Sequence, residues 1–177
     1  MSDVEKPDTE TMLYDGRFLQ AVKRGHWEFV RRKNTTGIVI IIALTPEDEL
    51  LFVEQFRPPV AARVIELPAG LAGDLVGQEH EALALAAARE LEEETGYRPG
   101  WIEELCEGPV SAGLTSEVVT FFRAHDLARV HDGGGDQHED IVVHRVPRAQ
   151  VPSWLAAKQA TGAMVDPKVY AALWFAR

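Results

Sequence analysis

The stretch "AAARELEEETGYRP", residues 86–99, places four glutamates within five positions: Glu90, Glu92, Glu93 and Glu94. It ends the strongest helical pattern in the chain, residues 79–96, which stops at Gly96. Runs typical of β-strands stand before and after this pattern, and further helical patterns follow toward the C-terminus. One central helix between strands predicts a mixed α/β layer structure.

Composition and turn residues predict the remaining organisation. We expect residues 1–10 to be disordered, residues 11–36 to form a small N-terminal antiparallel β-sheet, and residues 37–177 to form the main domain. Within the main domain we expect strands at 37–44, 50–56, from 64, 101–108, 117–125 and 140–146, and helices at 152–160 and from Asp166. The strand that begins at 64 is expected to give way to a glycine-rich loop that reaches 78.

The four glutamates differ in the direction in which they point. On a helical wheel of about 100° per residue, Glu90, Glu93 and Glu94 flank an apolar stripe, whereas Glu92 points away from it. Two partly buried carboxylates about 4 Å apart repel each other by about 4 kcal/mol at an effective dielectric constant of about 20. A divalent cation reverses this effect, and carboxylate oxygens suit Mg²⁺ or Mn²⁺. The pattern therefore indicates either a solvated helix surface or a metal site.

Composition and charge argue against several classes of protein. The chain of 177 residues has 28 acidic and 18 basic side chains, so a general nucleic-acid surface is disfavoured, while an anionic ligand fits if cations bridge it to the protein. The single cysteine, Cys106, excludes an internal disulfide and a cysteine zinc site. The polar start "MSDVEKPDTE" is unlike a signal peptide, and the longest apolar run, "GIVIIIAL", is too short to span a bilayer. We expect a cytoplasmic protein with no nucleic-acid or membrane partner.

The helix resembles the signature of the Nudix hydrolase superfamily, Gly-x5-Glu-x7-Arg-Glu-U-x-Glu-Glu-x-Gly-U, where U is a bulky apolar residue. The match runs from Glu81 through seven residues to Arg89 and on through "RELEEETGY" to Tyr97. The first half departs from the signature, because ten residues separate Gly70 of "ELPAG" from Glu81, and seven separate Gly73 from it. These extra residues lie in the predicted loop, where added length leaves the helical spacing unchanged.

The resemblance implies a Nudix-type α/β/α sandwich with a mixed sheet and a metal-dependent site. It implies two or three Mg²⁺ or Mn²⁺ ions, for which the expected ligands are Glu90, Glu93, Glu94, Glu139 and the Ala69 carbonyl. Arg89 and Glu81 would support the loop and helix without taking part in the chemistry. Glu92 has no role in the signature.

Outside the helix the chain resembles the ADP-ribose pyrophosphatase branch, through "VEQFRPP" (53–59), "SAGLTSE" (111–117) and "HEDIVVHRV" (138–146). This branch implies hydrolysis of the diphosphate linkage of ADP-ribose, or of a related nucleoside diphosphate sugar, to a nucleoside monophosphate and a sugar phosphate. Two positions depart from its pattern: Ala112 replaces a common proline, and Gln137 replaces a glutamate that acts as general base. The alternatives are a hydrolase for GDP-mannose or ADP-glucose, and a non-catalytic nucleotide-sugar-binding protein.

Because Gln137 cannot accept a proton, another residue must supply the general base. The first choice is Glu139, which matches the acid of the branch in this loop. Glu117 and Glu93 are further catalytic candidates. Asp136 and His138 are alternatives, and for each of these loop residues plain solvent exposure is the competing interpretation.

The predicted substrate contacts come from separate parts of the chain. Arg57, between a strand and two prolines, is placed to bind a phosphate, and the other candidates for substrate contact are Glu66, Gly113, Trp27 and Phe18. Trp27 and Phe18, with Arg31, would contact the base, although an aromatic residue in a strand more often packs in a core or an interface. The resemblance further implies a homodimer joined through the N-terminal sheet.

Overall fold

The apolar run that begins at Gly37 forms β4 (Gly37–Ala43), a strand covered on both faces. Its side chains alternate, so that Ile40 and Ile42 pack into one core cluster while Val39 and Ile41 pack into another. Strands buried on both faces read as continuous apolar runs, which explains why this one carries no polar residue.

The computed structural model describes residues 9–77, 79–135 and 140–176. The strands that surround β4 are β1 (Glu10–Asp15), β2 (Leu19–Arg24), β3 (Trp27–Arg32), β5 (Glu49–Arg57), β6 (Ala62–Glu66), β7 (Ala69–Ala72), β8 (Tyr97–Arg98), β9 (Trp101–Pro109), β10 (Val118–His125), β11 (Ala128–Arg129), β12 (Val142–Pro147) and β13 (Met164–Val165). The helices are α1 (Leu83–Thr95), α2 (Val151–Ala160) and α3 (Pro167–Phe175), with 3-10 turns η1 (Pro58–Val60) and η2 (Arg148–Gln150). The helices expected at 79–96, at 152–160 and from Asp166 are therefore present, with shifted ends.

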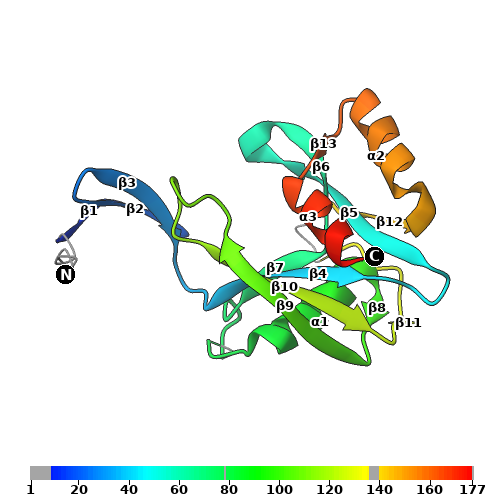
Figure 1. Cartoon of the computed structure of the whole chain (residues 1–177). Helices are drawn as coiled ribbons and strands as arrows, with labels where there is room; N and C mark the ends of the chain where they lie inside the picture. The colour runs from blue at the N-terminus through cyan, green and yellow to red at the C-terminus, as the bar shows by residue number, and fades with distance from the viewer. Residues whose placement is uncertain (1–8, 78, 136–139, 177) are drawn as a thin grey trace, which may run out of the picture.

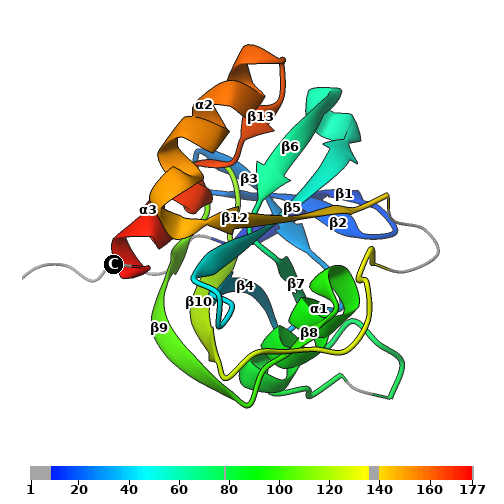
Figure 2. The ribbon, with the colours of Figure 1, turned by 90° about the vertical axis from the view of Figure 1, so that its right-hand side faces the viewer.

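Two four-stranded sheets form the central layer, one in the order β7-β4-β10-β9 and the other in the order β12-β5-β6-β13. β10 pairs with β4 in parallel, and β13 pairs with β6 in parallel, whereas their other neighbours are antiparallel. α1 covers one side of this layer, and α2 and α3 cover the other (Figure 2). The expected α/β/α sandwich with a mixed sheet is confirmed. Among the described residues, no helix has the length and apolarity needed to cross a bilayer.

The small N-terminal antiparallel sheet is also confirmed, with the order β1-β2-β3 (Figure 1). It extends away from the main body and is attached to it by main-chain hydrogen bonds. The Val30 amide donates to the Leu114 carbonyl at 2.9 Å, and the Ser116 amide donates to the Val30 carbonyl at 3.1 Å. β3 is thereby held beside the loop between β9 and β10. The predicted domain boundary at residue 36 falls between β3 and β4, and the predicted disorder of residues 1–10 lies almost wholly outside the described residues.

Two local predictions around the central helix were wrong. The helix begins at Leu83 instead of residue 79, because Glu79 accepts a hydrogen bond from the Gly77 amide and Glu81 is bound by Arg89. Residues 69–72, predicted as loop, form β7, which pairs antiparallel with β4 from Ala69 to Ala72. The glycine-rich composition predicted a loop, but these residues form a strand because β4, distant in sequence, supplies the hydrogen-bond partners.

A buried carboxylate, Glu54 of β5, joins this strand to β6, β12 and α2. Its Oε2 lies 2.7 Å from Lys158 Nζ and 2.8 Å from His144 Nε2, and its Oε1 accepts a hydrogen bond from Arg63 Nε at 2.9 Å. Burial raises the pKa of the Glu54 carboxyl, but the hydrogen bonds from Lys158, His144 and Arg63 outweigh burial and hold the pKa at about 2. Glu54 thus stays ionised and ties the second sheet to α2.

We predict that Glu54→Gln destabilises the fold by about 2 kcal/mol at pH 7, because it leaves two partly buried cations, Lys158 and Arg63, without this carboxylate. The folded pKa of Glu54 lies below the ordinary value of 4.5, so its contribution is present above that pH and is lost as the pH falls toward 2. Urea unfolding of both proteins across this range should therefore show the difference shrinking with acid. An equal difference at pH 7 and at pH 3 would contradict the prediction.

Candidate active site

α1 carries the glutamates beside β7 because its apolar residues fix its orientation. Ala86, Ala87 and Leu91 are fully buried in the core cluster that contains Val39 and Ile41. This packing leaves Glu94 buried, with an exposed fraction of 3%. Glu94 is thus the most deeply buried of the four glutamates.

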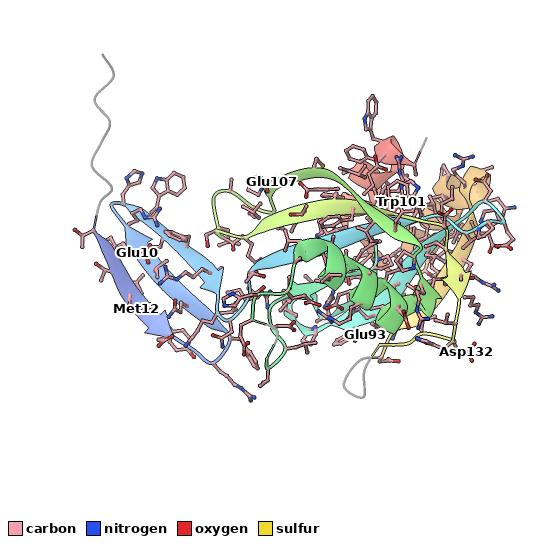
Figure 3. All side chains as sticks on the ribbon, turned by 90° about the horizontal axis from the view of Figure 1, so that it is seen from below. Glu10, Met12, Glu93, Trp101, Glu107 and Asp132 are labelled. Carbon is pink, nitrogen blue, oxygen red and sulfur yellow. The ribbon has the colours of Figure 1, made fainter. Side chains whose placement is uncertain are left out.

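The other glutamates of α1 lie closer to solvent. Glu92 binds Arg98 through both carboxylate oxygens at 2.7 Å, in agreement with its predicted outward direction. Glu93 is at the surface of the helix (Figure 3) and is the more exposed of the two, since 52% of its side chain is accessible against 27% for Glu92. The wheel placed Glu93 on the flank of the apolar stripe, so its exposure is larger than the wheel predicted.

Arg89 connects the helix to the preceding loop and to β7. Its Nε and Nη2 donate to the two oxygens of Glu81, each at 3.1 Å, and Nη2 also donates to the Leu71 carbonyl at 2.9 Å. Its Nη1 donates to Glu90 at 2.9 Å and to Glu93 at 3.1 Å. One guanidinium therefore holds three carboxylates, and the structure brings Arg89 and Glu81 together as the supporting role requires.

Glu94 and Ala69 are brought into contact between α1 and β7. The Ala69 amide donates a hydrogen bond to Glu94 Oε2 at 3.0 Å. The Ala69 amide makes this contact, whereas the sequence prediction concerned the Ala69 carbonyl. Both residues line the same cavity.

Glu90 lies directly over Gly70. A Cβ atom at position 70 would be 1.9 Å from the Glu90 Cδ, so only glycine leaves room for this carboxylate. Burial raises the pKa of Glu90 to about 7; the charges of Glu93 and Asp74 add to the rise, and Arg89 opposes it. The site thus holds a carboxyl group whose ionised form needs more positive charge than Arg89 provides.

These residues face a cavity of about 330 Å³, lined by Arg32, Ile38, Gln55, Arg57, Ala69, Gly70, Leu71, Asp74, Glu90 and Glu94. Arg57 is oriented within it by Glu66, whose Oε2 accepts a hydrogen bond from Arg57 Nε at 2.8 Å. Acids therefore line one part of the cavity and two arginines another, an arrangement that suits a cation together with an anionic ligand.

The donor types of this cavity fit a hard divalent cation. Carboxylate and carbonyl oxygens are the ligands that Mg²⁺ and Mn²⁺ prefer, and the raised pKa of Glu90 marks a shortage of positive charge. Within the described part of the chain, no three histidine, cysteine, aspartate or glutamate side chains are gathered as a ready metal cluster. Two of the expected ligands, Glu90 and Glu93, instead accept hydrogen bonds from Arg89.

Two further cavities share lining residues with the first or with each other. One, of about 230 Å³, is lined by Arg32, Thr35, Thr36, Gly37, Ile38, Ser116, Glu117 and Val118. The other, of about 260 Å³, is lined by Arg24, Trp27, Phe29, Ala112, Gly113, Thr115 and Ser116. Arg32 and Ile38 belong to the first two cavities and Ser116 to the last two, so the three form a row. The structure thus places Trp27 and Gly113, two of the predicted substrate contacts, in the lining of one cavity.

Of three other candidates, Phe18 and Arg31 line none of the three cavities, whereas Glu117 lines the middle one. Phe18 is 63% exposed and lines none of the three cavities; its ring lies under Arg17. Arg31 is bound to Glu10 and Gln20 within the N-terminal sheet. Glu117 lines the middle cavity, where it accepts a hydrogen bond from Arg32 Nε at 2.9 Å.

The candidates Glu139, Asp136 and His138, together with Gln137 at the position of the expected glutamate, lie outside the described residues. The chain that precedes them is attached to the end of α1. The Gly134 amide donates to the Glu94 carbonyl at 2.8 Å, and the Gly135 amide donates to the Glu93 carbonyl at 3.1 Å. Gly96 approaches the backbone of the same loop so closely that a Cβ atom there would be 2.1 Å from the His131 oxygen.

Sequence reasoning missed Arg32 and Asp74, which both line the acidic cavity. Asp74 belongs to the extended loop that separates Gly70 from Glu81. Its acidic side chain was the only feature of the sequence that could have indicated a place in the site. Arg32 stands beside Arg31 in "VRRK", and nothing in the local sequence distinguishes the arginine that faces a cavity from the one bound within its own sheet.

Comparison with known families gives one match over most of the chain, to the family described as "NUDIX domain", across residues 34–173. The chain belongs to the Nudix family. Nudix hydrolases in general depend on divalent metal ions. The matched range begins in the loop before β4, includes every residue that lines the acidic cavity except Arg32, and ends within α3.

Several curated relatives of this Nudix domain are similar to it. An "ADP-sugar pyrophosphatase" of Mus musculus is 34% identical over 92% of this chain and 83% of its own length. An "ADP-ribose pyrophosphatase" of Bacillus subtilis is 38% identical over 52% of this chain and 47% of its own length. A "Methanol dehydrogenase activator" of Bacillus methanolicus is 33% identical over 60% of this chain and 55% of its own length. The chain thus matches about half the length of the two Bacillus relatives.

A solved structure titled "Crystal structure of ADP compounds hydrolase" shares the fold of this Nudix domain. It superposes with a TM-score of 0.66 and 19% identity, and the match covers 86% of each chain. At this identity the likeness establishes the fold.

The Arg89 contacts predict a stability effect within this Nudix domain. Arg89→Gln should cost about 3 kcal/mol, because Glu81, with only 6% of its side chain exposed, would lose its buried counter-ion. Arg98→Gln is the matched control: it removes an equally bidentate partner of Glu92, but 61% of the Arg98 side chain is exposed, so solvent screens the pair and the free energy of unfolding should change much less than in Arg89→Gln. Urea unfolding of both variants compares the two. Equal costs would show that Arg89 does not hold the site together.

Proposed function

We propose that this protein hydrolyses the diphosphate linkage of a nucleoside diphosphate sugar, with ADP-ribose as the first substrate. The products would be a nucleoside monophosphate and a sugar phosphate. The observation that carries the proposal is the row of cavities that leads from Glu90 and Glu94, past Arg32 and Arg57, to Trp27. Relatives named ADP-ribose pyrophosphatase, ADP-sugar pyrophosphatase and GDP-mannose pyrophosphatase support the same class of substrate.

The arginines would bind the diphosphate. A guanidinium matches the geometry of phosphate oxygens, and Arg57 is already oriented by Glu66 at 2.8 Å. Arg32 reaches the same cavity from the N-terminal sheet. Arg32 and Arg57, which come from different parts of the chain, would thus both bind the negatively charged diphosphate of the substrate.

The acids would hold the metal. Glu90, Glu93, Glu94, the Ala69 carbonyl and Glu139 are the proposed ligands for two or three Mg²⁺ or Mn²⁺ ions. Bound there, the ions would neutralise the diphosphate and activate the attacking water. The role of Arg89 is then to release Glu90 and Glu93 to the metal while it keeps Glu81.

Glu139 is the proposed general base, since a carboxylate can accept the proton that Gln137 cannot. Glu93 stays the second candidate because it is exposed at the end of α1. Glu117 is the weakest of the three, because it lines the middle cavity and is bound to Arg32.

The base of the nucleotide would occupy the cavity that contains Trp27, Phe29 and Gly113. Aromatic side chains provide a stacking surface for a base, and Phe29 takes the place predicted for Phe18. We also propose a homodimer joined through the N-terminal sheet, because this sheet exposes several large apolar side chains: Met12, Leu13, Tyr14, Phe18, Leu19 and Trp27.

Product analysis tests the proposed function. The protein is incubated with Mg²⁺ and with ADP-ribose, ADP-glucose or GDP-mannose, and we expect a nucleoside monophosphate from ADP-ribose at the highest kcat/KM. A higher kcat/KM for GDP-mannose or ADP-glucose would keep the chemistry and change the substrate. Tight binding without any product would favour the non-catalytic alternative and overturn the proposal.

Matched glutamate variants test the site. Glu94→Gln should lower kcat by about 10³-fold or more, because removal of a metal ligand removes charge neutralisation from the transition state. Glu92→Gln should keep most of the activity, since Glu92 contacts Arg98 at the surface. Circular dichroism of both variants shows whether the fold is kept. Near-normal turnover of Glu94→Gln would contradict the assignment.

Gly70→Ala separates site geometry from stability. The new Cβ meets the mobile end of Glu90, so we expect the carboxylate to move and kcat/KM to fall about tenfold or more, with little change in the melting temperature. Gly108→Ala is the control, because a Cβ there has no neighbour within 4 Å. If both variants retain full activity, the position of Glu90 is unimportant to the reaction.

A further inference from the structure

Arg32 stands where the acidic cavity meets the middle cavity of the row. It is the last residue of β3, so it reaches the main domain from the N-terminal sheet. The middle cavity also contains Glu117, which directly precedes β10. The two residues are 85 positions apart in sequence and meet across the junction between the sheet and the main body.

The guanidinium of Arg32 is bound to the protein through its Nε atom. Its Nε donates to Glu117 Oε1 at 2.9 Å. Within the described part of the chain, its Nη1 and Nη2 groups donate no hydrogen bond to the protein. The four hydrogens on these terminal nitrogens therefore remain available to a ligand in the adjoining cavities.

The backbone of Glu117 is held by hydrogen bonds on both sides, so its carboxylate can hold Arg32 in a defined position. Its amide donates to Thr115 Oγ1 at 3.1 Å, and its carbonyl accepts from the Val110 amide at 3.2 Å. The neighbouring Ser116 amide is bound to the Val30 carbonyl of β3 at 3.1 Å. The carboxylate and the strand that carries Arg32 are thus attached to the same loop.

We propose that Glu117 is a positioning residue, which holds Arg32 so that its terminal nitrogens bind the diphosphate between the acidic cavity and the aromatic cavity. The inference rests on the proposed function. It reassigns Glu117, a candidate base in the sequence, to an indirect role that acts through Arg32. The pair also couples the N-terminal sheet to the acidic site, since each side supplies one partner.

This role has a kinetic signature that differs from that of a base. A diphosphate contact is made both in the bound substrate and in the transition state, so its weakening raises KM more than it lowers kcat. Loss of a general base lowers kcat instead and removes the acid limb of its pH profile. The two roles of Glu117 therefore give opposite results in one experiment.

The test compares steady-state hydrolysis of ADP-ribose with Mg²⁺ by the unsubstituted protein, Glu117→Gln, Arg32→Gln and the double variant. A charge-assisted hydrogen bond is worth about tenfold or more in affinity, so we expect Arg32→Gln to raise KM by about that factor. Glu117→Gln should raise KM less than Arg32→Gln and keep the pH profile of kcat. The double variant should resemble Arg32→Gln, because Glu117 acts only through Arg32.

Two further variants make the test specific. Glu117→Asp keeps the charge, so its KM should fall between those of the unsubstituted protein and Glu117→Gln. Asp48→Asn is the matched control, since it removes the acid of the Asp48–Arg148 ion pair, 3.0 Å long, which lines none of the three cavities. Its KM and kcat should be unchanged. Melting temperatures show whether each variant is folded.

Three outcomes would overturn the inference: a kcat of Glu117→Gln that is reduced at unchanged KM, effects that multiply in the double variant, or a normal KM for Glu117→Gln. If the unsubstituted protein hydrolyses no nucleoside diphosphate sugar, the proposed function fails separately. Calorimetric affinities for ADP-ribose then replace KM, and the same order of the variants supports or overturns the pairing.

Discussion

The contact on which the acidic site depends is the guanidinium of Arg89. It binds Glu81 before the helix, the Leu71 carbonyl of β7, and Glu90 and Glu93 on the helix itself. A planar guanidinium with five N–H donors can make all of these hydrogen bonds at once, whereas the ammonium group of a lysine, with three donors, cannot. Loop, strand and helix are therefore held in one arrangement by a residue that needs no part in the chemistry.

The electrostatics of the site follow from this arrangement. Arg89 compensates part of the negative charge of the helix, yet burial still raises the pKa of Glu90 to about 7. A protein with a net charge of −10 would repel a diphosphate, but Arg32 and Arg57 place positive charge at the cavity where the substrate is proposed to bind. The two arginines thus place positive charge beside the acids of the cavity, in a molecule whose net charge is negative.

How much the sequence predicts depends on the range of the interactions. The run at β4 and the helix at α1 were predictable because burial imposes a regular pattern on neighbouring residues. The assignment of the family rested on spacing within one loop and helix, which insertion of residues before Glu81 does not disturb. Glu92 was also placed correctly, since one turn of a helix decides its direction.

Long-range partners were not predictable in this way. β7 was read as a loop because its glycine-rich sequence has little strand propensity, while its pairing with β4 depends on residues about 30 positions away. Arg32 was missed because its partner, Glu117, is 85 positions distant. Exposure of Glu93 was underestimated for a related reason: the wheel contains the helix alone, whereas the direction of the side chain is set by Arg89 and by the strands beneath.

The attachment of β3 to the loop between β9 and β10 has a consequence for the aromatic cavity. Because Val30 is bound through its amide and its carbonyl to Leu114 and Ser116, both walls of the cavity that contains Trp27 and Gly113 belong to one polypeptide. Its shape is therefore set by intramolecular hydrogen bonds, and dilution that separates two subunits would leave these walls together. These two walls of the proposed nucleotide pocket are thus a property of the single chain.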